Sequence, residues 1–166
     1  MTQVPATLSQ ALERFSAVLE RDFKRLESMT FAQVETPREA ENWTPKQIIG
    51  HLTDSAANNH QRFVRGQLEP QPTYDFYDQN AWMDLQNYAA RDWSELLTFW
   101  HAYNRHLLHL MKTVKPETLE HVFQMPTGVP NAKTDGVSAV TLEFLMRDYV
   151  RHLEHHLVQI FPTSER

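Results

Sequence analysis

The sequence contains no cysteine, and this absence excludes several kinds of chemistry at once. Disulfides, zinc sites built on thiolates and a cysteine nucleophile all require that side chain. If thiol chemistry takes place on this protein, the thiol therefore comes from another molecule. Histidine, with nine residues, is the conspicuous alternative as a metal ligand and proton carrier.

The chain also lacks any cluster of lysine and arginine, and its formal net charge is -5. Nucleic-acid binding depends on a concentrated basic surface, so we expect no nucleic-acid partner. No apolar run approaches the roughly 18 residues needed to cross a bilayer. The opening stretch MTQVPATLSQ has neither the basic nor the apolar region of a signal peptide. We therefore expect a cytoplasmic protein that acts without a membrane.

Glycine is scarce too, with four residues in 166, which favours helices over turn-rich sheets. The hydrophobic share of 41% and the charged share of 22% are ordinary for a soluble globular protein. A chain of this length can bury a full core without disulfides or structural metals. We expect one domain that spans residues 1–166.

Four segments carry the apolar period of amphipathic helices. They cover approximately residues 6–28, 44–66, 92–114 and 141–161. The second has a clear start, because Thr44 can cap it, Pro45 suits its first position and Gln47 completes a capping box. Pro116 and Pro162 end the third and fourth. These segments predict an all-α fold, a four-helix bundle whose sites are built from side chains on facing helices.

The connections after the second and third predicted helices are too long for simple bundle turns. The first, GQLEPQPTYDFYDQNAW, has no sustained period and suits either a binding loop or a loop packed over the bundle edge. Four aromatic residues, three of them in this stretch and one before the second predicted helix, form either a wall beside a site or plain packing anchors: Tyr74, Tyr77, Trp82 and Trp43. The second connection, residues 116–140, contains HVFQM, which suits a short extended piece.

The last predicted helix ends in RHLEHHLVQI, which holds three histidines. At about 100° per residue, His156 lies about 50° from the apolar direction, His152 about 90° and His155 about 150°. His155 is therefore expected in solvent. His152 and His156, four residues apart, can aim two imidazoles at one ion. The chain has no HExxH motif, so a zinc protease is not supported, and ordinary use on a helix surface is the alternative for this pair.

Two ligands hold a first-row metal poorly, so another helix should supply a third. The second predicted helix offers His51, roughly 110° from its apolar direction on a polar stripe, and His60, which lies closer to that direction. Helix geometry leaves this choice open. The histidines of the third predicted helix lie about 100° or more from its apolar stripe and are expected in solvent: His101, His106 and His109. His121, in a connection, stays undecided.

Two motifs, WTPKQIIGHLTDS and DYVRHLEHHLVQI, resemble those of the DinB-like superfamily. The resemblance is closest to its metal-dependent hydrolase branch, near the bacillithiol transferases, and it covers nearly the whole chain, including YDQNAW. It implies a four-helix bundle with one divalent metal ion held by three histidines. Carried over by position, the first motif selects His51 and the second selects His152 and His156. The resemblance thus favours His51 over His60.

Three imidazoles leave a metal ion with an open position, as in catalytic sites. Zinc held in this way lowers the pKa of its water to about 7 or binds a thiolate, while zinc, nickel and iron all suit imidazole. The resembling family is associated with transferases and isomerases that use low-molecular-weight thiols such as bacillithiol or mycothiol. The expected function is a metal-dependent thiol S-transferase or hydrolase that activates such a thiol, or water, against a small electrophilic substrate.

Two other hypotheses remain from the sequence. One is a non-catalytic, metal-binding stress-response bundle that forms a homodimer, in which the ion fixes structure. The other is a haem-binding bundle, which is weaker because the chain has no CxxCH motif. For orienting the ligating imidazoles, Asp148 is a better candidate than Glu154, which points away from the core. Asp54 and Asn58 lie nearer to His51.

Overall fold

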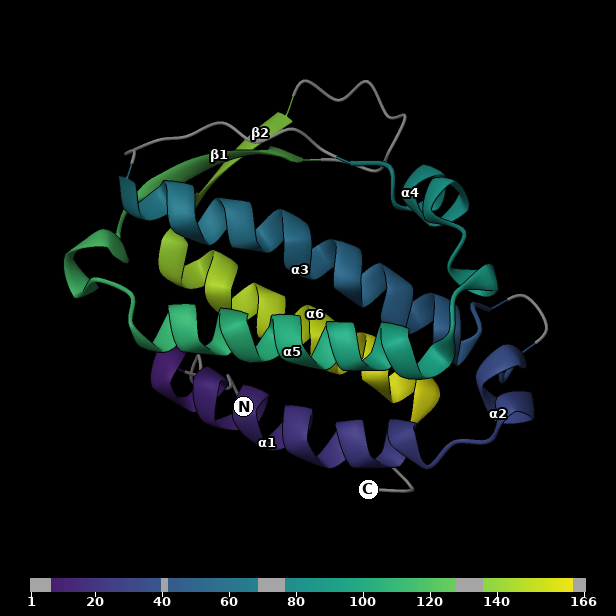
Figure 1. Cartoon of the computed structure of the whole chain (residues 1–166). Coiled ribbons are helices and arrows are strands. Elements are labelled where there is room, and N and C mark those ends of the chain that lie inside the picture. Colours follow the sequence, from purple (N-terminus) through teal and green to yellow (C-terminus); the bar gives the residue numbers. More distant parts are fainter. Residues whose placement is uncertain (1–6, 40–41, 69–76, 128–135, 163–166) are drawn as a thin grey trace, which may run out of the picture.

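The computed structural model of the chain describes residues 7–39, 42–68, 77–127 and 136–162 (Figure 1). It confirms the predicted all-α four-helix bundle. The long helices are α1 (Leu8–Glu27), α3 (Pro45–Leu68), α5 (Trp93–Lys112) and α6 (Leu142–Ile160). The short elements between them are α2 (Phe31–Glu35), α4 (Gln79–Gln86), η1 (Tyr88–Ala90), η2 (Pro116–Thr118), β1 (Val122–Thr127) and β2 (Gly136–Thr141).

The four long helices form a bundle in which only the middle consecutive pair, α3 and α5, are also neighbours in space. α1 packs against α5 and α6, and α3 packs against the same two helices. Consecutive long helices, α1 and α3 or α5 and α6, therefore occupy diagonal corners (Figure 1). A connection between diagonal corners has to cross an end of the bundle, which explains why the connections from α1 to α3 and from α5 to α6 are long.

Side-chain caps mark where the long helices begin, and the capping box predicted at α3 is present. At α3, the Thr44 hydroxyl accepts from the Gln47 backbone N–H at 3.2 Å, and the Gln47 side chain accepts from the Thr44 N–H at 2.9 Å. Asp92 caps α5 by accepting from the Glu95 N–H at 2.9 Å. Thr141 caps α6 in the same way. Each cap satisfies backbone donors that a helix leaves unpaired, and so fixes where the helix begins.

The apolar stripes of all four long helices meet in one core. Its largest fully buried side chains come from α1, α3, α5, β1 and α6: Trp100, Phe15, Phe63, Phe123, Leu19, Leu26, Ile49, Leu52, Leu96, Leu107, Met111 and Leu142. Full burial of one such leucine or phenylalanine contributes about 1.5–3 kcal/mol. No helix in the described ranges combines the length and apolarity that a membrane crossing requires.

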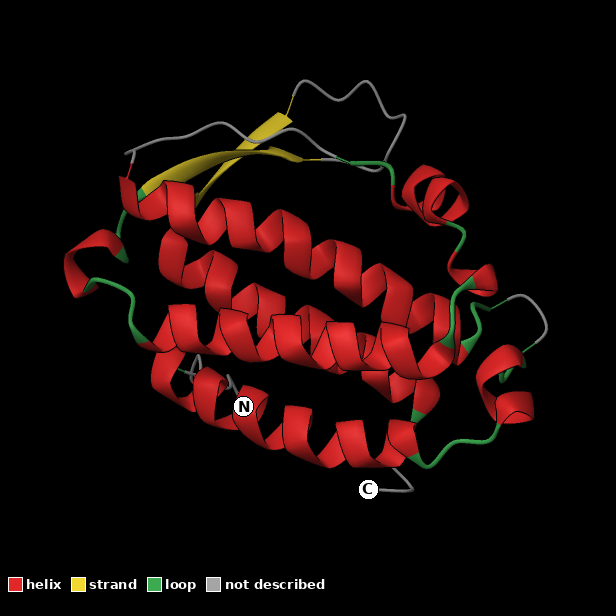
Figure 2. Cartoon of the chain, in the orientation of Figure 1, coloured by secondary structure: helices red, strands yellow, loops and turns green. Residues whose placement is uncertain are grey.

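The two long connections are more ordered than the sequence pattern indicated. The first contains α4, which Asp78 caps and which ends at Asn87 in the left-handed conformation (φ 48°). In the second, HVFQM was expected to be extended, and β1 confirms this. β1 pairs antiparallel with β2, with Val122 opposite Thr141, and the resulting hairpin covers α3 (Figure 2). The β2 partner and the short helices were not predicted.

Candidate metal centre

Three of the predicted site residues meet between α3 and α6. His51 projects from α3, and His152 and His156 project from α6. Their candidate ligand atoms all lie within 4.8 Å of one another, and the Nε2 atoms of His51 and His152 are 3.3 Å apart. His51 is buried, whereas His152 and His156 are half-buried, so the cluster has a closed side and an open side.

The geometry of this cluster fits a divalent metal ion. Tetrahedral zinc holds imidazole nitrogens at about 2.0–2.1 Å, which places two such nitrogens about 3.3 Å apart. The spacing of 3.3 Å between the Nε2 atoms of His51 and His152 matches that requirement. On the other side of both rings, the Nδ1 atoms are buried and make no hydrogen bond in the structure, although buried polar atoms are normally paired.

The surroundings hold the three imidazoles in their neutral form. Burial lowers the pKa of His51 to about 3, and the positive charges of His156 and His152 act in the same direction. Burial lowers the pKa of His152 to about 4, partly opposed by Asp148. Burial also lowers the pKa of His156, against a raising effect of its hydrogen bond with Gln159. Neutral rings are the form that binds metals, so the cluster needs to lose no proton near pH 7.

Gln159 orients one ring of the cluster. Its Oε1 atom lies 3.1 Å from Nδ1 of His156, and since an amide oxygen only accepts, Nδ1 carries the proton. The lone pair of that ring is then on Nε2, as a metal ligand requires. The sequence contained this residue in the same motif, one turn after His156, but its partner role was not predicted.

The two acidic residues of α6 that were considered as partners, Asp148 and Glu154, make no hydrogen bond with the ligating rings. Asp148, the better candidate on α6 from the sequence, accepts hydrogen bonds from Arg151, with Nε at 3.0 Å, and makes none with His152. Its effect on His152 is electrostatic. Glu154 points away as expected and pairs with Arg14 at 3.2 Å.

Asp54, one turn after His51, is the buried carboxylate nearest in sequence to the cluster. Its Oδ1 accepts from the Tyr88 hydroxyl at 2.6 Å and from the Gln86 side-chain amide. Burial raises the pKa of this carboxyl, opposed by those two hydrogen bonds. Asn58 is tied to the same turn, because its side chain donates to the Asp54 carbonyl at 2.9 Å.

Trp43 lies against the histidine cluster, as part of the predicted aromatic wall. Its ring centroid is 5.0 Å from that of His51 and 6.3 Å from that of His156, with the latter pair stacked. The ring centroids of Tyr77 and Trp82 are 5.0 Å apart. Burial, followed by the charge of Asp54, raises the pKa of Tyr77 to about 12. The fourth predicted member, Tyr74, lies outside the described residues.

The histidines of α5 take different positions. His106 and His109 are exposed, as expected. The expectation was wrong for His101, which stacks on Phe23 with centroids 4.0 Å apart and is only partly accessible. Burial lowers its pKa. The helix-wheel angle placed His101 away from the α5 apolar stripe, but that side of α5 faces α1 rather than water.

The remaining histidines lie outside the cluster. Nδ1 of His60 is 3.1 Å from the Tyr103 hydroxyl, so His60 faces α5. Nδ1 of His121 donates to the Gly66 carbonyl at 2.8 Å, which ties η2 and β1 to α3. His155 is exposed, as predicted. The structure therefore places His51, rather than His60, beside the α6 pair.

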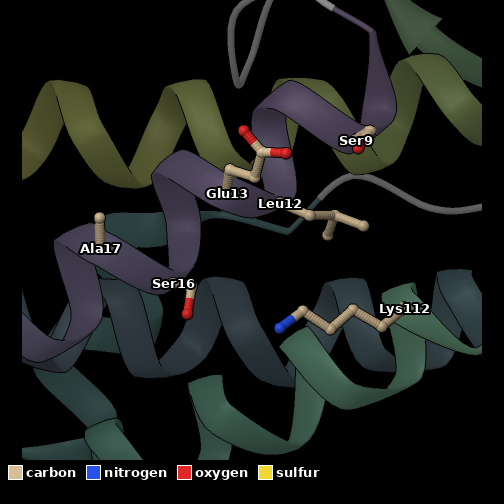
Figure 3. A pocket seen from close by; sticks show the side chains of 6 residues that line it. All are labelled: Ser9, Leu12, Glu13, Ser16, Ala17 and Lys112. Carbon is tan, nitrogen blue, oxygen red and sulfur yellow. The ribbon is translucent and has the colours of Figure 1, made fainter.

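A surface hollow between α1 and α5 lies apart from these residues (Figure 3). Six residues line it: Ser9, Leu12, Glu13, Ser16, Ala17 and Lys112. Its only ionic groups are one carboxylate and one ammonium at exposed positions, and it contains no histidine. The hollow therefore offers no alternative to the histidine cluster as a metal centre.

The chain is similar to known proteins over nearly its whole length. Residues 6–160 match the DinB superfamily. The chain is 29% identical over its full length to YfiT of Bacillus subtilis (strain 168), covering 81% of that protein, which is named as a proposed metal-dependent hydrolase. It is 26% identical over 95% of its length to a protein of the same description from Bacillus mycoides (strain KBAB4), covering 83% of it.

Solved structures show the same architecture. The structure of YfiT from Bacillus subtilis, described as having an unusual four-helix bundle topology, superposes with a TM-score of 0.76 at 27% identity over 96% of this chain and 89% of that one. A mycothiol-dependent maleylpyruvate isomerase superposes with a TM-score of 0.73 over 98% of this chain and 65% of that one, at 14% identity, and so shares the fold. The chain belongs to the DinB superfamily.

Proposed function

We propose that this protein is a metal-dependent enzyme in which His51, His152 and His156 hold one divalent ion of zinc, nickel or iron. Bound there, the ion would supply a Lewis acid that activates a low-molecular-weight thiol or water against a small electrophilic substrate. The observation that carries the proposal is the convergence of three neutral imidazoles, within 4.8 Å of one another, from two helices far apart in the sequence.

The number of ligands favours a catalytic role over a structural one. Among the residues that the structure describes, the group of metal-ligating side chains has three members, all histidine. Structural zinc sites use four protein ligands, whereas catalytic sites use three and leave one position open. The half-buried His152 and His156 mark the side from which a substrate can approach. This supports an enzyme over a bundle whose ion only stabilises the fold.

The residues around the cluster have separable tasks. Gln159 fixes the His156 ring so that Nε2 faces the cluster. Trp43 covers the rings of His51 and His156 and limits the access of water to them. The apolar face of an indole also suits the uncharged part of a small substrate.

The absence of cysteine supports an external thiol as the co-substrate. A chain without its own thiol cannot form a mixed disulfide with a bound thiol, and a metal ion held by three imidazoles can accept a thiolate as an additional ligand. The shared fold with a protein described as mycothiol-dependent is consistent with this proposal.

The test begins with protein that carries no histidine tag, loaded in turn with zinc, nickel and iron(II). Each form is assayed for conjugation of thiols, including cysteine and its glycosylated derivatives, to 1-chloro-2,4-dinitrobenzene, and for hydrolysis of 4-nitrophenyl acetate. We expect turnover with at least one metal that disappears in His152→Ala and persists in His155→Ala. Equal rates in the two variants would contradict the site. Stoichiometric metal with no turnover of either probe would instead favour a binding protein.

A further inference from the structure

Asp54 is a buried carboxylate that accepts hydrogen bonds through only one of its two oxygen atoms. It is 3% exposed. Oδ1 accepts two hydrogen bonds, from the Tyr88 hydroxyl at 2.6 Å and from the Gln86 side chain. Oδ2 is buried and has no hydrogen-bond partner in the structure. An unpaired buried acceptor costs about 1–3 kcal/mol, so a partner for Oδ2 is expected in the functional state.

The end of α4 and the residues after it hold the Oδ1 side of this carboxylate. Asn87, between the two donors, adopts the left-handed conformation with φ 48°, which turns the chain between Gln86 and Tyr88. The Tyr88 ring lies so close to α3 that a Cβ atom on Gly50 would be 2.4 Å from its Cδ2 atom. Asp54 therefore cannot turn freely to exchange its two oxygens.

Lys46 strengthens the same attachment. Its ammonium group, 5% exposed, donates to the Ala89 carbonyl at 2.9 Å and to Glu35 at 2.6 Å. Lys46, Gly50 and Asp54 follow one another at intervals of four residues and so form one face of α3. That face holds the segment from Gln86 to Ala89, while the adjacent face carries His51.

Nδ1 of His51, one turn earlier on α3, is a second buried polar atom that has no hydrogen-bond partner in the structure. Residues three apart on a helix are neighbours, and side chains lean toward the helix N-terminus, so the Asp54 carboxylate leans over the turn that holds His51. When Nε2 of a neutral imidazole binds a metal, the ring proton resides on Nδ1. The two unpaired atoms are then a donor and an acceptor on residues one helical turn apart.

We propose that Asp54 is the positioning residue of the metal centre, and that its Oδ2 accepts a hydrogen bond from Nδ1–H of His51. Tyr88 and Gln86 hold Oδ1 and thereby direct Oδ2 to this task. This inference rests on the proposed metal site. A carboxylate in this role fixes the ring orientation and raises its basicity, and losing such a partner typically weakens metal affinity about 10- to 100-fold.

The variant Asp54→Asn tests the role because it keeps an acceptor for Tyr88 and Gln86 but replaces Oδ2 with an amide donor. Zinc affinity is measured by competition with a chromogenic chelator, on untagged protein. We expect affinity to fall about 10- to 100-fold in Asp54→Asn. The matched variant Tyr88→Phe removes a hydrogen bond to Oδ1 and leaves Oδ2 unchanged, so its affinity should fall less. Parent affinity in Asp54→Asn, or a larger loss in Tyr88→Phe, would overturn the proposal.

A second measurement needs no variant and covers the case in which Asp54→Asn fails to fold. In the zinc-loaded parent, long-range ¹H–¹⁵N spectra identify the imidazole nitrogens of His51. We expect a low-field Nδ1–H signal that exchanges slowly with water, and free exchange at this nitrogen would contradict the hydrogen bond. If the parent binds no zinc while it is folded, the proposed metal centre itself fails, which is a different result from normal binding with an unaffected Asp54→Asn.

Discussion

The two halves of α3 are built alike but differ in what surrounds their histidines. The first half carries His51, and the second carries His60. In each half a glycine allows close contact with an aromatic ring: Tyr88, from the connection after α3, packs against Gly50, and Phe123 of β1 packs against Gly66. Only His51 is joined by further histidines of α6, while His60 meets Tyr103 and His106 of α5.

This difference shows that the helix opposite a histidine decides its role more than its own position does. His51 faces α6, where two residues four apart present rings to the same point. His60 faces α5, where its Nδ1 is already engaged by a tyrosine hydroxyl. One half of α3 therefore offers a free set of ligand atoms, and the other offers a hydrogen-bonded contact between helices.

The largest effect should come from removing each histidine in turn. We expect His51→Ala to lose stoichiometric metal, because two half-buried imidazoles hold a first-row ion poorly, and His60→Ala to keep it. Metal content is measured by mass spectrometry after dialysis of untagged protein. His60 is half-buried on the same helix, so its variant controls for general disturbance of α3. Equal metal loss in both variants would show that the two halves are not distinct.

The next effect concerns the pH dependence of stability in the metal-free protein. The pKa of His51 is about 3 and that of His152 about 4 in the folded chain, against 6.5 as the ordinary value. Between these pH values the unfolded chain binds more protons than the folded chain. The contribution of these two histidines to the free energy of unfolding is therefore complete above about pH 6.5 and is lost as the pH drops toward 3. Each such proton adds a slope of about 1.4 kcal/mol per pH unit.

Urea unfolding between pH 4 and 8 measures this slope. We expect His51→Gln to flatten the curve below about pH 6.5, since it removes one group that unfolding allows to charge. His60→Gln should flatten it less, because the pKa of His60 is lowered by burial and His106 at a more accessible position. A steeper curve in His51→Gln would mean that the ring is charged in the folded protein.

Much of the fold could be predicted because local chemistry and global packing agree. Thr44, Pro45 and Gln47 determine the start of α3, and the apolar stripes fix which faces pack. The diagonal arrangement could not be predicted, since an amphipathic stripe does not identify which helix will cover it. β2 was missed because a two-stranded hairpin depends on its partner and on the surface it covers.

The candidate site, too, could be predicted only in part from the sequence. The spacing of His152 and His156 predicts that their rings meet, whereas the choice of His51 over His60 required either the family resemblance or the structure. His101 was misjudged because its angle was measured from the α5 stripe alone, while Phe23 of α1 covers it. Gln159 contacts His156 through one hydrogen bond, and such a contact has no periodic pattern in a sequence.

A smaller effect should follow from adding a methyl group at either glycine of α3. A Cβ atom at Gly50 would be 2.4 Å from Cδ2 of Tyr88, and one at Gly66 would be 2.0 Å from Cζ of Phe123. We expect Gly50→Ala and Gly66→Ala each to lower the free energy of unfolding by about 1–3 kcal/mol, as overpacking does. Alanine's helix propensity offsets part of this loss.

Metal affinity separates these two variants. The Tyr88 hydroxyl donates a hydrogen bond to Asp54, so displacing the Tyr88 ring disturbs the carboxylate of Asp54, one turn after His51. Gly66→Ala displaces only the hairpin. We expect zinc affinity to fall in Gly50→Ala and to stay at the parent value in Gly66→Ala, as measured by chelator competition. Equal affinities would indicate that Tyr88 does not transmit its position to the site.

The smallest effect should come from the contact that occupies His60. Tyr103→Phe removes the hydrogen bond of 3.1 Å to His60 Nδ1 and retains the ring, so the free energy of unfolding should fall by only about 1 kcal/mol. Metal content should not change, because the three-histidine group includes neither residue. If freeing His60 raised the bound metal above one equivalent, the second half of α3 would hold latent ligand capacity that the tyrosine normally suppresses.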